Sequence, residues 1–402
     1  PTGVTFGYGA LFPEKYQHAF YIADWSYGKM YAVHLRPKGA SYEAEFEEFM
    51  AAQPLPLSDM EIHPDGAMYV AIGGRKVQSG LYRVTYEGGD WTDPAGKMRG
   101  GEQERLLRHQ LEHYHTHQSP EAIIEAWPHL ESEDRAVRHA ARLAIEHQPI
   151  NWWFGNAVTE TDPQAKIAAL VAAASMGEGR EGILDDLLGS LGSLDYQDLN
   201  RQQRLDLLRA YALTIVRHGG GYPNNLTPAQ TQKVLSNLDD HFPAPTPEEN
   251  IELTQLLANL GSESMAKKTV ALLENAPSQE EQIAYAKNLR LVKVGWTPEL
   301  RERYFEWFVR AQTYRGGAAF GKFIESIRSD AVAQLGDSER IALNVILEKK
   351  PQQAQPQFAA KLRQFVKNWQ VQDFDDVINV GLEGNRDFAN GRNIFGTTGC
   401  FA

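Results

Sequence analysis

The residue with the most distinctive chemistry is Cys400, the only cysteine, two residues from the end of the chain. It stands in GRNIFGTTGCFA (391–402), directly after Gly399 in a glycine-containing turn that follows an apolar-periodic stretch. A single thiol forms no disulfide within the chain and gives no argument for an oxidising compartment. One cysteine is weak evidence for any motif that needs two thiols. Cys400 alone is therefore compatible with an ordinary free thiol.

Histidines at four-residue spacing form a second candidate site. In RHQLEHYHTH (108–117), His109, His113 and His117 would share one face of a continuous helix, as zinc ligands do. No carboxylate-and-histidine partner follows nearby, and the helix could end before His117. We therefore favour solvated or packing histidines over a metal site.

Charged residues at the ends of predicted strands form a third candidate. Asp24, Asp59 and Arg75 are carboxylates and a guanidinium of the kind that bind a cofactor or remove a substrate proton. The simpler alternative is an Asp–Arg hydrogen-bonded pair between strands. His63, in the IHPDG turn, is predicted to be a turn residue rather than a base.

Two further groups have structural interpretations. Trp152 and Trp153 are expected to be buried between helices, and Arg138 and Arg142 to pair with neighbouring carboxylates such as Asp134 or Glu146.

Composition limits the classes of function. The chain has 402 residues, 42% of them hydrophobic, and 52 acidic against 40 basic residues give a net charge of −12. This charge opposes nucleic-acid binding, and no apolar run reaches the roughly 18 residues of a membrane span. The chain begins at Pro1 without a charged-then-apolar leader, and we expect both ends to be cut, with any signal peptide lost upstream.

The first 86 residues have the pattern of β-strands. Short runs rich in Tyr, Val and Ile alternate in polarity between Gly, Pro and Asp turn signals, at 19–25, 28–35, 66–74 and 80–86. The Pro-Asp-Gly turn that feeds the strand at 66–74 is typical of β-propeller blades. About two blades' worth of strands is predicted.

After a glycine-rich connector at 86–101, the period becomes helical as far as residue 368. One helical hairpin unit recurs with variations in segments 134–145, 250–261 and 280–291. This repetition predicts an α-solenoid of HEAT type. Residues 373–384 predict a linker helix, and 387–395 the first helix of a new domain. The predicted divisions are propeller blades (1–88), linker (89–101), helical solenoid (102–370), and linker with the start of a new domain (371–402).

This order of segments resembles a known family. The chain is similar to the large modular bacterial haem-binding proteins. The similarity is most specific in the terminal GRNIFGTTGC and in segments 24–35 (DWSYGKMYAVHL), 54–86 and 134–153. In these proteins a sorbosone/glucose-dehydrogenase-like β-propeller is followed by HEAT repeats and a c-type cytochrome. The resemblance implies a multidomain, mostly α, α+β fold: partial propeller blades, a HEAT-like solenoid and the first helix of a cytochrome c domain.

The resemblance also implies a role for Cys400. It would be the first cysteine of a CxxCH haem-attachment motif whose second cysteine and histidine lie past Ala402. Covalent haem c needs both thiols and the histidine ligand, so the chain as given would hold an incomplete site. Because haem c is attached outside the cytoplasm, the implied location is periplasmic or exported.

Two functions follow as expectations. In the first, the propeller of the parent oxidises a sugar or alcohol and the cytochrome accepts the electrons. Arg75, Asp59 and Asp24 are then the candidate catalytic residues, and the resemblance allows PQQ as a cofactor, although these residues do not support it. In the second, the chain is a non-catalytic scaffold whose propeller and concave solenoid surfaces bind a protein or polysaccharide. The substrate and the oligomeric state stay open.

Overall fold

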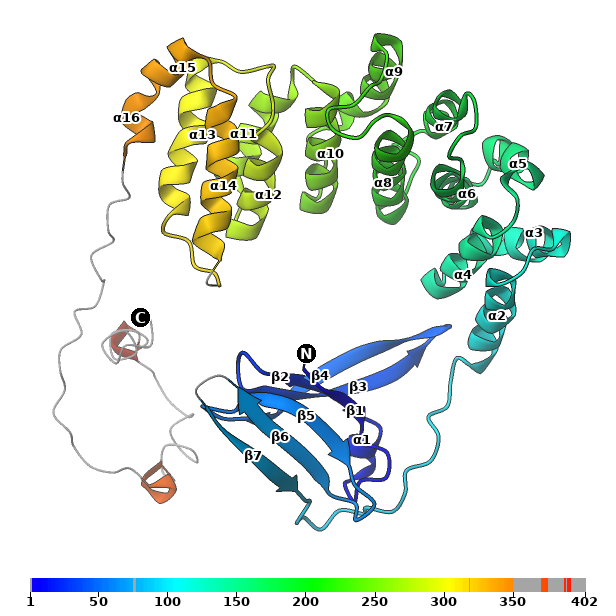
Figure 1. Cartoon of the computed structure of the whole chain (residues 1–402), viewed down its shortest axis with the longest axis vertical. Helices are drawn as coiled ribbons and strands as arrows, with labels where there is room; N and C mark the ends of the chain where they lie inside the picture. Colours follow the sequence, from blue (N-terminus) through cyan, green and yellow to red (C-terminus); the bar gives the residue numbers. More distant parts are fainter. Residues whose placement is uncertain are drawn as a thin grey trace. The chain divides into compact units, whose positions relative to one another are not determined.

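The computed structural model describes residues 2–74, 77–317 and 319–349, with short pieces at 370–374, 387 and 389–391 (Figure 1). The described elements are mostly helical, and the strands fall within the first 84 residues. The expected mostly α, α+β fold class is therefore confirmed. The chain divides into two compact units: Pro1–Thr269 with Val292–Gly295, and Val270–Leu291 with Trp296–Ala402.

Two antiparallel sheets begin the first unit. One has the order β1 (Val4–Phe6), β2 (Phe20–Asp24), β3 (Lys29–Lys38) and β4 (Ser41–Ala51), with the short helix α1 (Glu14–Gln17) between β1 and β2. The other has the order β5 (Leu57–Ile62), β6 (Met68–Gly74) and β7 (Val77–Val84). All four predicted strand runs are confirmed as β2, β3, β6 and β7, and β1, β4 and β5 are additional.

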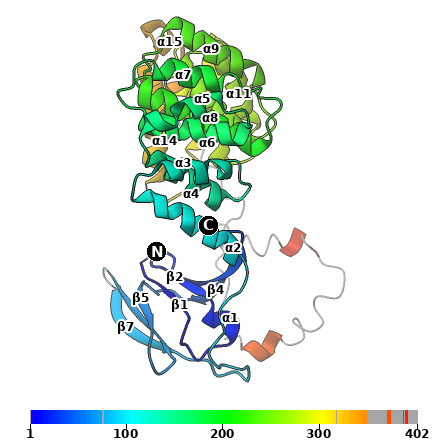
Figure 2. The same ribbon diagram turned by 90° about the vertical axis from the view of Figure 1, so that its right-hand side faces the viewer.

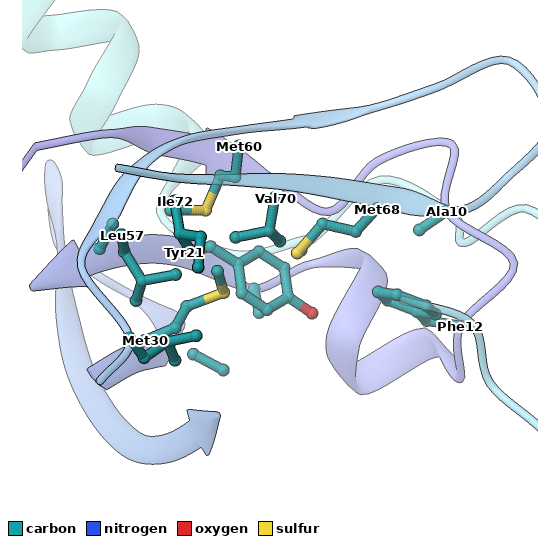
Figure 3. Packing of buried hydrophobic residues seen from close by; sticks show 13 residues of the cluster. Ala10, Phe12, Tyr21, Met30, Leu57, Met60, Met68, Val70 and Ile72 are labelled. Atoms are coloured by element: carbon teal, nitrogen blue, oxygen red, sulfur yellow. The ribbon is translucent and has the colours of Figure 1, made fainter. Parts of the chain in front are cut away.

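The two sheets share one hydrophobic core (Figure 3). Alternation along each strand turns every second side chain inward. Tyr21 and Met30 from the first sheet and Leu57 and Met68 from the second are fully buried there. Thr2 links the sheets at their edge, since its hydroxyl donates to the Leu57 carbonyl at 2.6 Å.

The opposite face of the first sheet is apolar along β1 and β2. Val4 and Phe6 of β1 pair with Ile22 and Phe20 of β2, and the Phe6 and Phe20 rings lie 4.9 Å apart. Val4 is 49% exposed and Phe6 42% exposed. This face is covered by no other sheet in the part of the chain that the structure describes.

The helices of the first unit stack in two rows (Figures 1 and 2). The even-numbered row consists of α2, α4, α6, α8 and α10, each of which contacts the next. The other row contains α5, α7 and α9, which also contact each other in succession. The two rows are joined because α3, α5, α7 and α9 each contact the next even-numbered helix. Their bounds are α2 (Glu102–Glu112), α3 (Pro120–Ala126), α4 (Arg135–Glu146), α5 (Phe154–Thr159), α6 (Pro163–Met176), α7 (Ile183–Leu191), α8 (Arg201–His218), α9 (Pro228–Leu238) and α10 (Pro247–Leu260).

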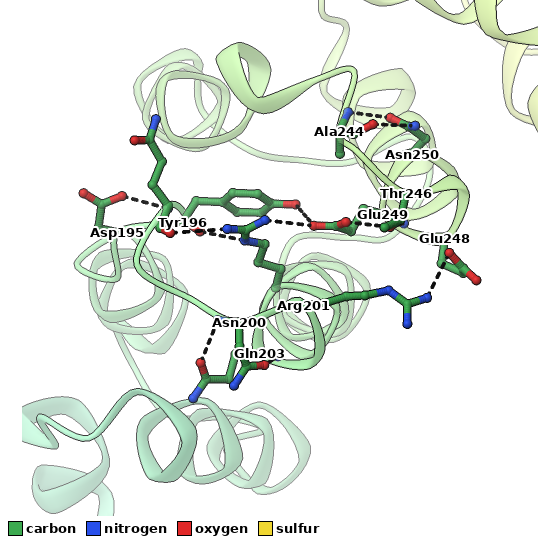
Figure 4. Close-up of polar contacts among 12 residues, drawn as sticks. Asp195, Tyr196, Asn200, Arg201, Gln203, Ala244, Thr246, Glu248, Glu249 and Asn250 are labelled. Atoms are coloured by element: carbon green, nitrogen blue, oxygen red, sulfur yellow. Dashed lines mark hydrogen bonds and ion pairs between the residues drawn. The ribbon is translucent and has the colours of Figure 1, made fainter.

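Side-chain caps and polar ties fix these helices. As predicted, several begin at a Ser, Thr or Asp cap, for example Ser119 before α3 and Asp162 before α6. Between the α7–α8 connection and α10, the Tyr196 hydroxyl donates to Glu249 Oε1 at 3.3 Å, and Glu249 is only 1% exposed (Figure 4). Burial and the Glu249 carboxylate raise the pKa of Tyr196, which keeps this hydroxyl protonated as the donor.

The second unit is also helical. α11 (Met265–Asn275) crosses the boundary between the units and is followed by α12 (Gln279–Leu289), α13 (Pro298–Ala311), α14 (Phe320–Ala333), α15 (Asp337–Ala342) and α16 (Asn344–Leu347). Its core contains Tyr304, whose hydroxyl donates to the Ala286 carbonyl at 2.8 Å, and Trp307, whose indole donates to Gln282 at 2.9 Å. No helix among the described residues is long and apolar enough to cross a membrane.

One carboxylate joins the strands of the first unit to its helices. Asp134 caps α4, with Oδ1 accepting from the backbone N–H of Ala136 at 2.8 Å and of Val137 at 3.3 Å. Its Oδ2 accepts from the N–H of Ala40, in the turn between β3 and β4, at 2.5 Å. The carbonyl of the same Ala40 accepts from Arg108 of α2 at 2.9 Å. Both polar groups of one turn residue are thus bound by the helical part.

Gly39 is required for this approach. Its φ of +54° favours glycine, and a Cβ there would lie 2.0 Å from Asp134 Oδ2. Burial alone would raise the pKa of Asp134, but the N–H groups of Ala40, Ala136 and Val137, with the charge of Arg108, hold it below its ordinary value.

Replacing this carboxylate by an amide separates its two tasks. In Asp134→Asn the cap is retained, but the side-chain NH2 faces the Ala40 N–H, so we expect the free energy of unfolding to fall by about 1–2 kcal/mol. Asp162→Asn is the matched control, because Asp162 caps α6 through Ala165 alone. It should change stability by less than about 0.5 kcal/mol in urea unfolding. Equal losses in both variants would contradict the assignment.

The effect should depend on pH. Because the folded-state pKa of Asp134 lies below its ordinary 3.8, its stabilising contribution is complete above pH 3.8 and is lost as the pH falls through the folded-state value. The stability difference between the wild type and Asp134→Asn should therefore shrink below pH 3.8 in unfolding curves recorded at several pH values. A difference that stays constant down to full protonation would contradict the role of the charge.

Candidate functional site

Asp24 and Asp59 are each engaged by backbone close to them in sequence. Asp24 Oδ1 accepts from the N–H of Ser26 at 2.9 Å and of Tyr27 at 3.0 Å, which makes it a turn residue at the end of β2. Asp59 Oδ1 accepts from the N–H of Met60 at 2.9 Å. No hydrogen bond or ion pair joins the two aspartates within the described ranges, and Arg75 lies outside them.

An Asp–Arg pair does occur between the turn that joins β5 to β6 and strand β7. Asp65 Oδ2 lies 3.1 Å from Arg83 Nη2, and the N–H of Ala67 donates to Asp65 Oδ1 at 3.0 Å. The Ala67 N–H and then His63, Arg83 and Tyr69 hold the pKa of Asp65 well below its usual range. The predicted turn role of His63 is confirmed, since its backbone N–H donates to the Ala67 carbonyl at 3.0 Å.

The three spaced histidines do not share one helical face. α2 ends at Glu112, and a 3-10 turn covers His113–His115. The His109 imidazole instead contacts Glu112 at 2.8 Å, while the His113 and His117 rings lie 4.2 Å apart. Among the residues whose placement is described, no group of three or more His, Cys, Asp or Glu could hold a metal ion.

The remaining expectations have mixed outcomes. Cys400 lies outside the described residues. Trp153 is fully buried as predicted, and its indole donates to the Gln148 carbonyl at 3.2 Å. The burial predicted for Trp152 was wrong, since this side chain is 47% exposed. The 3-10 turn Ile150–Trp152 directs successive side chains to different sides. The Arg142–Glu146 ion pair is confirmed.

Arg138 differs from its predicted role. It donates to the Ser132 carbonyl rather than to Asp134, whose oxygens are already bound by three backbone N–H groups.

A groove of about 260 Å³ crosses three successive helices of the even-numbered row, α4, α6 and α8. We call it the arginine groove. Its lining consists of Arg135, Arg138, His139 and Arg142 from α4, Gln164, Ile167, Ala168 and Val171 from α6, and Asp206 and Arg209 from α8.

The sequence of α4 separates its two faces. Val137, Ala140, Ala141 and Ala144 are buried against the neighbouring helices, and the small alanines permit close packing. Arg135, Arg138 and Arg142 follow at i, i+3 and i+7 and therefore lie along one side of the helix. Ile167 and Ala168 of α6 are buried beneath them and form part of an apolar floor.

The arginines of the groove differ in their partners. Arg142 pairs with Glu146, and Arg209 Nε lies 3.2 Å from Glu252 Oε1. Arg138 is bound only by a neutral carbonyl. In the described part of the chain, the Arg135 guanidinium has neither a hydrogen bond nor an ion pair. Two guanidinium charges are therefore not neutralised by a carboxylate.

His139 reports the positive field of the groove. Its Nδ1 lies 3.3 Å from Arg142 Nη2, and because a guanidinium only donates, Nδ1 must be an acceptor and the proton sits on Nε2. Burial and then the charges of Arg142, His115 and Arg135 hold the pKa of His139 below its ordinary 6.5. The ring is therefore neutral near pH 7.

Removing groove arginines should raise this pKa. Arg142→Ala removes the charge that has the larger effect on His139, together with the donor to Nδ1, so we expect the larger rise in pKa. Arg135→Ala should give a smaller rise in the same direction. The measurement is an NMR titration of the His139 imidazole, with Arg201→Ala on α8 as a control outside the groove lining. An unchanged or lowered pKa in both groove variants would contradict a positive field there.

Comparison with known proteins adds little to this geometry. No protein-family model matches the chain, and no curated protein matches it. Among solved structures, the crystal structure of an engineered protein is similar at 16% identity over 61% of this chain and 69% of that chain. Its TM-score is 0.38, which does not establish a common fold.

Proposed function

We propose that the chain is part of a dehydrogenase-like electron-transfer protein that binds haem c. In this proposal residues 1–88 belong to a β-propeller that oxidises a sugar or alcohol, the helices form a HEAT-like solenoid, and Cys400 provides one thioether bond to haem. The observation that carries it is the terminal segment GRNIFGTTGC, taken with the order of strands followed by helices.

The first sheet supports the propeller part of the proposal. It is an antiparallel meander of four strands, β1 to β4, as in a propeller blade. One of its faces packs on the second sheet, and its other face presents Val4, Phe6, Phe20 and Ile22. Strands with apolar residues on both faces, as in β1 and β2, are expected where a sheet is packed on both sides, as between two neighbouring blades.

The residues for the cofactors are unevenly represented. Haem c would supply a one-electron redox centre, and this chain offers Cys400 as one of the three groups that attach it. The second thiol and the histidine ligand would have to follow in the longer protein. For a quinone, Asp24 and Asp59 offer little, because each accepts hydrogen bonds from backbone beside it. We therefore assign no step of the reaction to them.

Covalent haem is the decisive measurement for this proposal. When the natural full-length protein is produced together with a haem c maturation system, we expect haem that stays bound through denaturing electrophoresis. Cys400→Ala should lose most of it, because one of the two thioether bonds is removed. Thr397→Ala, three residues away, is the matched control and should keep its haem. Wild-type protein without covalent haem would contradict the proposal and leave the scaffold alternative.

A further inference from the structure

We propose that the arginine groove binds a small ligand that carries two or more oxyanion groups, either carboxylate or phosphate. The inference concerns the helical part alone and does not depend on haem. It starts from a contrast of charge: the whole chain carries −12, whereas the groove is lined by four arginines and a single carboxylate, Asp206.

The partners of these arginines point to a missing anion. The Asp206 carboxylate already accepts from Gln202 at 2.9 Å, and Glu146 and Glu252 neutralise Arg142 and Arg209. Arg135 and Arg138 keep their charge beside the His139 imidazole, whose pKa is lowered by burial and then by Arg142, His115 and Arg135. An anion in the groove would relieve this repulsion and be attracted by the same field.

The spacing favours more than one oxyanion. Arg135 and Arg142 are seven residues apart, which places them about 10 Å apart along the helix axis, with Arg138 between them. Arg209 approaches from α8, across the floor of α6. The guanidinium groups of Arg135 and Arg138, which have no carboxylate partner, can each hold a carboxylate or phosphate through two parallel hydrogen bonds. His139 Nε2–H adds a neutral donor, and Ile167, Ala168 and Val171 offer contact to the carbon atoms of an organic anion.

The size of the groove favours a small molecule. A volume of about 260 Å³ is at or below the lower end of ordinary ligand sites, so a compact polyanion fits better than a macromolecule. A nucleic acid is further disfavoured by the net charge of −12.

Calorimetric titration tests the proposal. The full chain is titrated at low ionic strength with citrate and, in a separate experiment, with pyrophosphate. We expect saturable binding of at least one, and the preferred probe tells carboxylate from phosphate. The double variant Arg135→Ala/Arg138→Ala should bind at least about tenfold more weakly, because two charge-assisted contacts are lost. The control double variant Arg36→Ala/Arg201→Ala makes the same change of net charge at arginines that pair with Glu45 and Glu248 outside the groove. It should bind as the wild type does.

His139 gives a second readout. Bound anion should raise the pKa of its imidazole in the wild type, because negative charge favours the protonated ring. The proposal is overturned if neither probe binds saturably at millimolar concentration, or if both double variants weaken binding equally, which would indicate a diffuse charge effect. Binding of a hexaglutamate peptide without either small probe would also overturn it, in favour of an acidic protein partner. Thermal unfolding of each variant establishes that it is folded.

Discussion

The hydrogen bonds of the Asp134 carboxylate connect the two kinds of structure in the first unit. One oxygen begins α4 and the other holds the turn between β3 and β4. The next residue along the chain is Arg135, the arginine of the groove that has no partner in the described part of the chain. The cap that fixes the start of α4 therefore also fixes the start of the arginine row, and the register of that row over α6 and α8 follows from the packed alanines on the opposite side.

Much of this architecture could be predicted from local patterns. Alternating polarity identified β2, β3, β6 and β7, and capping residues marked several helix starts, because both signals depend on neighbouring residues alone. β4 was missed because its sequence, SYEAEFEEFMA, is rich in glutamate and it pairs on only one side. The end of α2 before His113 was left open, since no proline or glycine marks it.

The candidate site required information that the sequence does not contain locally. Arg138 and Arg142 were noticed, but only as partners for carboxylates on their own helix. The groove arises because α6 brings an apolar floor beneath them and α8 brings Arg209 from about 70 residues away, an arrangement set by helix packing. The bond from Arg138 to Ser132 likewise depends on Asp134 being occupied by the distant Ala40. The sequence did contain one sign of the groove. Arg135 lies three residues before Arg138 and has no acidic residue four positions after it.

The most direct test of the account is whether a single carboxylate binds the strands and the helices together. NMR spectra of the backbone amides of Ala40, Ala136 and Val137, recorded as the pH is lowered, measure this. The account predicts that all three amide protons shift with one common pKa below 3.8, the ordinary value for aspartate. If Ala136 and Val137 titrate together while Ala40 does not follow them, the carboxylate caps the helix only, and the connection described here does not exist.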